Sequence, residues 1–214
     1  TNLKTYVKEG SGFYDITPIR LTTSAGDVTF AKVADGDATI TVSDTAHGAV
    51  MHDFVTFSGA ASLGGNITDT VLNQEYQVAT VVDANSYTIE AKDTSGDPVL
   101  AAAGDSGNGG GSIVGAYQLN TGLDTYVSST GWSIDGWGLS AYGSASSLTF
   151  TNQLRLWSSD NFGEDLILHP RGGAIYYWDQ SGGTSARAVN ITSLSGANLA
   201  PTVGLQSIVS ETDR

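Results

Sequence analysis

The feature that most constrains this chain is a period-two alternation of apolar and polar residues, which recurs along the sequence between turn signals. Such alternation indicates half-buried β-strands, whereas an amphipathic helix needs apolar residues at i, i+3 and i+4, a pattern that is not sustained here. The 27 glycines and four prolines supply turns. They show no G-X-Y period, which excludes a collagen-like chain. The sequence therefore predicts an all-β fold.

Residues 25–117 hold one group of expected strands. The last two strands of this group flank a turn at 83–85 and predict a hairpin, because Asp and Asn side chains bond nearby backbone in turns. Several short strands in so short a segment favour a small closed β-barrel, which leaves no strand edge exposed. Residues 94–112 are mostly Gly, Ser, Asp and Ala and are interpreted as a flexible return linker. The expected strands are residues 38–42, 54–57, 75–82 and 86–91.

The two flanks of this segment predict a second group of strands. Residues 12–20 are interpreted as one exposed strand ended by a proline. Further along the chain, three short strands with tight turns form a β-meander of the kind that makes one blade of a β-propeller. The strands of this meander are expected at residues 154–157, 165–169 and 173–179, with turns at 160–163 and 170–173.

Charge and aromatic residues divide the chain in the same way. Residues 25–117 carry twelve acidic against two basic residues, which gives −10 of the net charge of −13. All five arginines and all four tryptophans lie outside that segment. We therefore expect a propeller-like host, residues 1–24 and 118–214, with a small barrel, residues 25–117, inserted into it. Strong acidity argues against tight nucleic-acid binding, which needs Lys and Arg to displace counterions.

Both ends of the sequence have the pattern of strands. Residues 2–7 and 206–210 alternate in the same way as the internal strands. A strand with an unpaired edge is prone to aggregation, so each is expected to pair with a neighbour. We therefore expect these end strands to complete sheets with further chain, as in a piece of a larger β-protein.

Composition and motifs exclude several kinds of site. The chain has no cysteine, which rules out disulfides, thiolate zinc ligands and a cysteine nucleophile. No apolar run approaches the roughly 18 residues of a membrane-spanning helix, so no membrane span is expected. The glycines at 107–111 are not followed by the Lys of a phosphate-binding loop, and no hydrolase or metalloprotease motif occurs. We expect neither a cofactor nor catalytic residues, and hence no enzyme.

Two of the three histidines could belong to a metal site. His47 and His52 lie five residues apart, with Asp44 and Asp53 nearby. A metal site needs at least three converging ligands that a second shell holds in place. We favour the alternative, a loop with scattered polar residues, and expect no metal.

A group of carboxylates, Asp160, Glu164 and Asp165, could supply the pair of acids that glycoside hydrolysis requires. The same group could bind calcium, but it lacks the spacing of a calcium-binding loop. We favour a third interpretation, in which these residues cap turns and carry solvated charge.

Aromatic residues recur every five positions at Trp132, Trp137 and Tyr142. This period fits neither a helix nor a strand and indicates a loop. Flat rings stack on sugars or fill pockets of a protein partner, so these three residues are the candidate contacts for a glycan or a partner. The alternative is that they pack in the core or in a subunit interface of the host.

Six short segments in the two flanks carry a recognisable pattern: NLK at 2–4, YDITPIR at 14–20, LRLWS at 154–158, NFGEDL at 161–166, PRGG at 170–173 and YWD at 177–179. These segments resemble tail-tube and nozzle-type proteins of tailed phages. Residues 45–48, 53–60, 76–78 and 85–89 are similar to a recurrent phage module. That module is described as resembling the first catalytic-cysteine half domain of ubiquitin-activating enzymes. This second similarity concerns a small-barrel fold alone, because a chain without cysteine cannot perform ubiquitin chemistry.

The resemblance implies a structural component of a virion tail, in a nozzle, tail-tube or hub ring. Its partners would be copies of itself and neighbouring tail proteins, and it would be assembled in the host cytoplasm. The alternative is a carbohydrate-binding module of a tail fibre or surface protein that uses the three aromatic residues. A third possibility is a polysaccharide hydrolase that uses Asp160 or Glu164. The acidic barrel is expected to project from the outer face of the tail.

Overall fold

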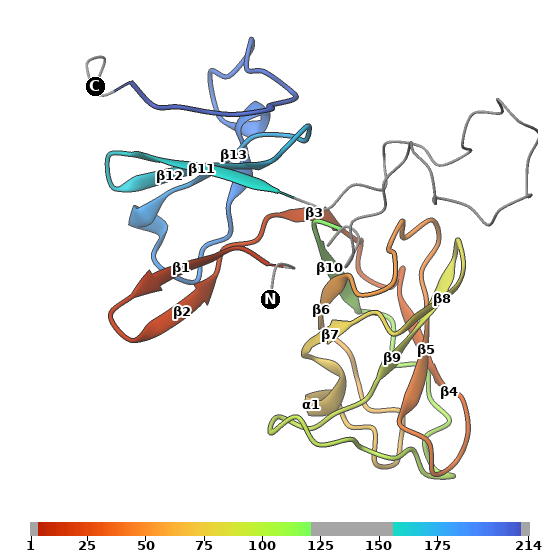
Figure 1. The fold of residues 1–214 in the computed structure, drawn as a ribbon. Helices are drawn as coiled ribbons and strands as arrows, with labels where there is room; N and C mark the ends of the chain where they lie inside the picture. Colours follow the sequence, from red (N-terminus) through yellow and green to blue (C-terminus); the bar gives the residue numbers. More distant parts are fainter. Residues whose placement is uncertain (1–3, 121–155, 211–214) are drawn as a thin grey trace, which may run out of the picture. The chain divides into compact units, whose positions relative to one another are not determined.

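The computed structural model describes residues 4–120 and 156–210. In these residues 14 strands form four antiparallel sheets, accompanied by one short α-helix, α1 Asp69–Leu72 (Figure 1). The prediction of an all-β fold is confirmed. The chain divides into two compact units, one made of Thr1–Thr17 with Thr121–Arg214 and the other of Pro18–Asn120. No helix of the described residues is long and apolar enough to cross a membrane.

The Pro18–Asn120 unit contains two four-stranded sheets. The first has the order β3 Ile19–Thr22, β10 Val114–Gln118, β6 Phe54–Ser58 and β7 Glu75–Gln77. The second has the order β4 Thr29–Lys32, β5 Thr39–Ser43, β9 Ser86–Glu90 and β8 Thr80–Asp83. Strands β8 and β9 form the hairpin that the sequence predicted.

The core of this unit is formed by the apolar residues that alternate with polar residues along its strands. In β5, Ile40 and Val42 are fully buried while the threonines beside them are partly exposed, and β6 and β9 alternate in the same way. Aromatic rings from different strands meet in the centre, as where Phe30 and Phe57 pack edge to face at 4.9 Å between ring centroids. Such edge-to-face pairs add to the stabilisation that burial provides.

The prediction of a closed barrel is wrong, because the described strands form two open sheets. The reason lies in residues 75–82, which the sequence predicted as one strand. The Val78 amide donates to the carbonyl of Asp53, beside β6, whereas the next amide, Ala79, donates to the carbonyl of Thr88 in β9. The chain therefore passes from one sheet to the other at this corner, and β7 and β8 become edge strands of different sheets.

The prediction of a flexible linker at 94–112 is also wrong. Backbone hydrogen bonds attach this segment along its length: Ala101 donates to Asp37, Phe30 donates to Asn108 and Ala61 donates to Gly109, at 2.7–3.0 Å. Glycine is required at Gly109, where φ is +85° and a Cβ atom would lie 2.7 Å from the Phe30 ring. The glycines of this segment allow close packing, although their composition suggested flexibility.

The first part of the other unit is a hairpin of β1 Tyr6–Glu9 and β2 Gly12–Asp15. The strand predicted over 12–20 is interrupted after Asp15, since β2 pairs with β1 whereas β3 pairs with β10 in the Pro18–Asn120 unit. Asp15 anchors the hairpin through ion pairs with Lys4, at 3.0 Å, and Arg187, at 2.7 Å. Residues 18–24, which the sequence assigned to the host, therefore pack in the unit that contains the expected insertion.

A four-stranded meander forms the second part of this unit. Its strands are consecutive in the chain and neighbours in the sheet: β11 Trp157–Phe162, β12 Asp165–Pro170, β13 Tyr176–Trp178 and β14 Val189–Asn190. A meander is present as predicted, but its first strand is displaced: β11 begins at Trp157, the last residue of the strand expected over 154–157. The expected turn at 160–163 is shorter than predicted, because β11 continues to Phe162 and the reversal occurs at Gly163, which has a φ of +73°.

Residues 206–210, predicted as a strand, join no sheet in the structure. The Ser207 amide donates to the Ser158 hydroxyl at 3.5 Å, and the Val209 amide donates to the Asp160 carboxylate at 2.7 Å. Side chains of β11, instead of its backbone, hold this segment. The prediction of a strand over residues 206–210 is therefore wrong.

Candidate functional site

The aromatic residues predicted to contact a glycan or a partner, Trp132, Trp137 and Tyr142, lie outside the residues that the structure describes. Their role stays a prediction.

His47, the first candidate metal ligand, is buried and has both ring nitrogens engaged. The Ala49 amide donates to Nδ1 at 3.0 Å, and Nε2 lies 3.1 Å from the carbonyl oxygen of Asp83. Because a carbonyl can only accept, the proton of the ring belongs on Nε2. His47 thus connects two loops and has no lone pair left for a metal.

The two aspartates near His47 are also engaged. Asp44 accepts a hydrogen bond of 2.6 Å from the Tyr117 hydroxyl, which lies 2.9 Å from the hydroxyl of Tyr87. Burial raises the pKa values of both tyrosines, so they remain protonated donors. Asp53 accepts from the Val50 amide and the Asn120 side chain. In the described part of the chain no three His, Asp or Glu residues are grouped as a metal would require.

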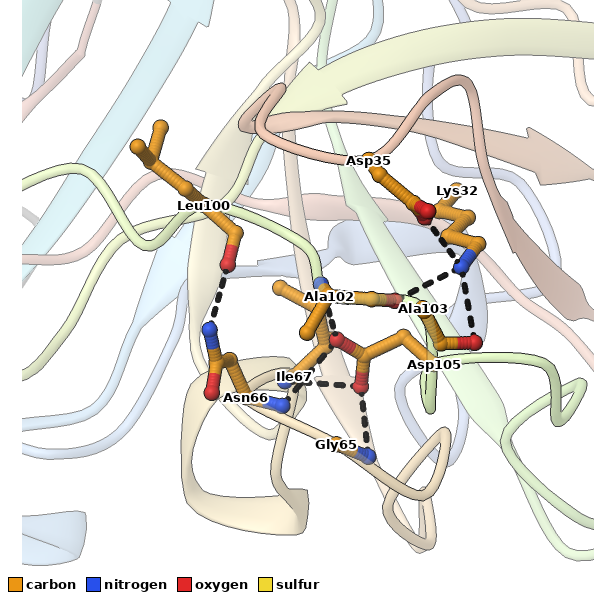
Figure 2. Close-up of polar contacts among 9 residues, drawn as sticks. All are labelled: Lys32, Asp35, Gly65, Asn66, Ile67, Leu100, Ala102, Ala103 and Asp105. Carbon is orange, nitrogen blue, oxygen red and sulfur yellow. Dashed lines mark hydrogen bonds and ion pairs between the residues drawn. The ribbon is translucent and has the colours of Figure 1, made fainter.

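Asp105 is a polar centre that sequence analysis missed. Its carboxylate is almost completely buried and accepts four backbone hydrogen bonds, from the amides of Gly65 (2.8 Å), Asn66 (3.0 Å), Ile67 (2.9 Å) and Ala102 (2.8 Å). Figure 2 shows these amides converging on the carboxylate from two loops. Burial raises the pKa of Asp105, but the four hydrogen bonds outweigh burial and hold the pKa below its ordinary value.

Two further side chains fasten the same loops. The Lys32 ammonium donates to the carbonyl of Ala102 and to the carboxylate of Asp35, both at 2.6 Å. The Asn66 side chain donates to the carbonyl of Leu100 at 2.9 Å (Figure 2). The arrangement is a structural clamp, because every acceptor and donor of Asp105 and Lys32 is used within the unit.

The candidate glycosidase residues hold loops as well. Asp160 accepts from the Val209 amide, and Asp165 accepts from the Gln180 amide and the Tyr177 hydroxyl. The hydrogen bonds from Tyr177 and Gln180 lower the pKa of Asp165, and the bond to Asp165 raises the pKa of Tyr177 to about 12. These contacts join segments that are distant in the chain, so the interpretation of Asp160, Glu164 and Asp165 as caps of turns stays a prediction.

A cavity of about 340 Å³ lies beside the first residues of β11. Three segments far apart in the sequence line it: the start of β11, the turn after β12, and the segment near the C-terminal end of the described chain. The lining residues are Leu156, Trp157, Ser158, Arg171, Leu205 and Gln206. The sequence offered no local signal for this site, because no two of these segments are neighbours along the chain.

Three buried polar atoms without hydrogen-bond partners belong to a residue that lines this cavity or to residues that adjoin its lining in the chain or in the sheet. They are the indole Nε1 of Trp157, Nε2 of His169 and the hydroxyl of Ser207. His169 is fully buried and is the ladder partner of Ser158, and Ser207 follows the cavity residue Gln206. Buried polar groups are normally paired, so such a concentration marks a place where a partner is missing.

Comparison with known proteins gives little further information. No family model matches the chain, and no curated protein does. Among solved structures, the endosialidase of phage phi92 matches with a TM-score of 0.27 and 12% identity over 83% of this chain. The match covers 24% of that protein, so the chain spans about a quarter of its length. A likeness at this level carries no argument about function.

Proposed function

We propose that this chain is a structural, non-enzymatic component of a phage tail that assembles with copies of itself and with neighbouring tail proteins. The observation that carries the assembly is a run of exposed apolar side chains near the C-terminal end of the described chain. Leu199, Leu205 and Ile208 are 98, 68 and 79% exposed. Large apolar side chains with this degree of exposure, so close together in the chain, favour a protein–protein contact.

The way in which polar residues are used supports a scaffold. Asp44, Asp105 and Asp165 each accept hydrogen bonds from residues of their own unit. His47 accepts a hydrogen bond with one ring nitrogen and bonds to a second loop with the other. Groups that are committed to holding loops in this way give rigidity to an assembly subunit. Catalytic groups, in contrast, need a free donor or acceptor that faces the substrate.

The assignment to a tail rests on the phage-like segments of the sequence. Within the described residues, those segments include the hairpin strand β2 and the meander strands β11 to β13. The position proposed for this chain is a nozzle or hub ring of the tail, through which DNA is ejected. Each copy would contribute a propeller-like platform to that ring. The acidic Pro18–Asn120 unit would then decorate the outer face, since an acidic surface gives no affinity for phosphates.

Sedimentation velocity tests the assembly. The chain should form a discrete oligomer, and Leu199→Ser with Ile208→Ser should shift it to monomer at the same concentration. Val33→Ser, which changes a half-exposed apolar residue of the other unit, serves as the control and should keep the oligomer. A chain that is monomeric at all concentrations, or a control that dissociates like the double variant, would refute the proposal.

Carbohydrate binding is the second candidate function, and the cavity beside β11 favours it. A glycan array tests the carbohydrate contacts that the sequence predicts, which are made by Trp132 and Trp137. Specific binding that is lost in Trp132→Ala and Trp137→Ala would favour a carbohydrate-binding module over a purely structural role.

A further inference from the structure

The cavity beside β11 combines apolar and polar walls. Leu156 and Leu205 contribute apolar surface, while Ser158 and Gln206 can both donate and accept hydrogen bonds. Its volume of about 340 Å³ lies at the small end of the range for ligand sites. The cavity therefore suits a ligand of few atoms that presents C–H groups and hydroxyls together.

The unpartnered buried atoms of Trp157, His169 and Ser207 belong to the wall of the cavity or to the residues next to it. The indole Nε1 of Trp157 can only donate, and the Ser207 hydroxyl can do either. Nδ1 of His169 lies 3.2 Å from the carbonyl of Pro170, so in the neutral ring Nδ1 carries the proton and Nε2 is an acceptor.

Arg171 adds a positive charge to the cavity wall. Its side chain is exposed and has no ion-pair partner among the residues that the structure describes, although the chain carries a net charge of −13. A guanidinium binds carboxylates through two parallel hydrogen bonds. An arginine left unpaired in such an acidic chain, at the wall of a cavity, favours an anionic group on the ligand.

Together these features define a ligand class. We propose that the cavity binds a sugar unit that carries a carboxylate, as a hexuronic acid does, with the carboxylate on Arg171 and the hydroxyls on Ser158 and Gln206. The ring would present its C–H face to Leu156 and Leu205. All the residues that line the cavity belong to one unit of the chain.

Saturation-transfer NMR and titration calorimetry with glucuronic acid and glucose test the proposal on the full chain. Glucuronic acid should bind saturably, and glucose, which lacks the carboxylate, should bind at least tenfold more weakly. Arg171→Gln should reduce glucuronic acid binding at least tenfold, to the level of glucose. Lys8→Gln removes the same charge from the β1–β2 hairpin and should leave binding unchanged.

Gln206→Ala is the second variant, because Gln206 lies on an exposed segment where truncation is tolerated. This variant should weaken the binding of both sugars, since it removes a contact to their hydroxyls. Three results would each overturn the proposal. They are that neither sugar binds, that acetate binds as tightly as glucuronic acid, or that Arg171→Gln and Lys8→Gln lose glucuronic acid affinity to the same extent. Unfolding midpoints of all variants establish that each protein tested is folded.

Discussion

Asp105 supports two loops of the Pro18–Asn120 unit, and its replacement by Asn gives a sharp test of the fold. The change keeps the size of the side chain and removes one acceptor oxygen. Oδ1 now accepts from Gly65 and Ile67, and Oδ2 accepts from Asn66 and Ala102. In Asp105→Asn an NH₂ group faces two backbone donors, so two buried N–H groups lose their partners.

The size of the effect follows from those two donors. Each buried donor left without a partner costs about 1–3 kcal/mol, so we expect a loss of about 2–6 kcal/mol in the free energy of unfolding. Asp97→Asn is the matched control: it makes the same change of charge in the same unit, but at an exposed residue. The free energy of unfolding of the control should be close to that of wild type, as is usual for surface substitutions.

Urea unfolding can follow the two units separately. All four tryptophans lie outside residues 18–120, so tryptophan fluorescence reports the other unit. Near-ultraviolet circular dichroism of tyrosine includes the buried core residues Tyr76, Tyr87 and Tyr117 together with six tyrosines of the other unit. The part of its transition that tryptophan fluorescence does not follow therefore reports the Pro18–Asn120 unit. Asp105→Asn should lower the midpoint of the tyrosine signal and leave that of tryptophan unchanged. Equal midpoints for Asp105→Asn and Asp97→Asn would refute the clamp.

The pH dependence supplies a second test of Asp105. Its pKa is lowered by folding, so the carboxylate stabilises the folded state above the ordinary pKa of 3.8, and this contribution is lost as pH falls through the folded pKa. The difference in stability between wild type and Asp105→Asn should therefore be constant near pH 7 and shrink below about pH 4. A difference that does not change with pH would show that the charge of Asp105 is not involved.

Three further predictions concern the same fold. Tyr117→Phe should destabilise the protein by about 1–3 kcal/mol in urea unfolding, because Asp44 stays buried without its donor. Gly59→Ala should destabilise more than Gly36→Ala: both glycines have positive φ, but only at Gly59 would the added Cβ lie 2.3 Å from a backbone oxygen. A Gly-Ser bridge in place of Pro18–Asn120 should leave the other unit folded, because a backbone hydrogen bond joins the two ends of that range; loss of a cooperative tryptophan transition would contradict this.

The strands were predictable where local alternation coincides with burial. Residues 86–91 alternate and form β9, whose Tyr87 and Ile89 face the core. Alternation does not say where a chain changes sheets. The run over 75–82 was therefore predicted as one strand, although Val78 and Ala79 bond to different sheets.

Composition misled at residues 94–112 because glycine serves flexible linkers and close packing alike. Only the position of the Phe30 ring against Gly109 distinguishes the two, and that contact joins residues far apart in the sequence. The cavity beside β11 was unpredictable for the same reason. Trp157, Arg171 and Leu205 come together only through the meander and the segment that Ser158 and Asp160 hold.

The most direct test of the central proposal is cryo-electron microscopy of the virion that carries this chain. We expect copies of the chain in a ring within the tail, with the acidic residues Asp35, Asp37 and Asp69 of the Pro18–Asn120 unit on the outer surface. The exposed segment with Leu199 and Ile208 should be buried between copies. A tail without the chain, or copies that do not contact one another, would contradict the account.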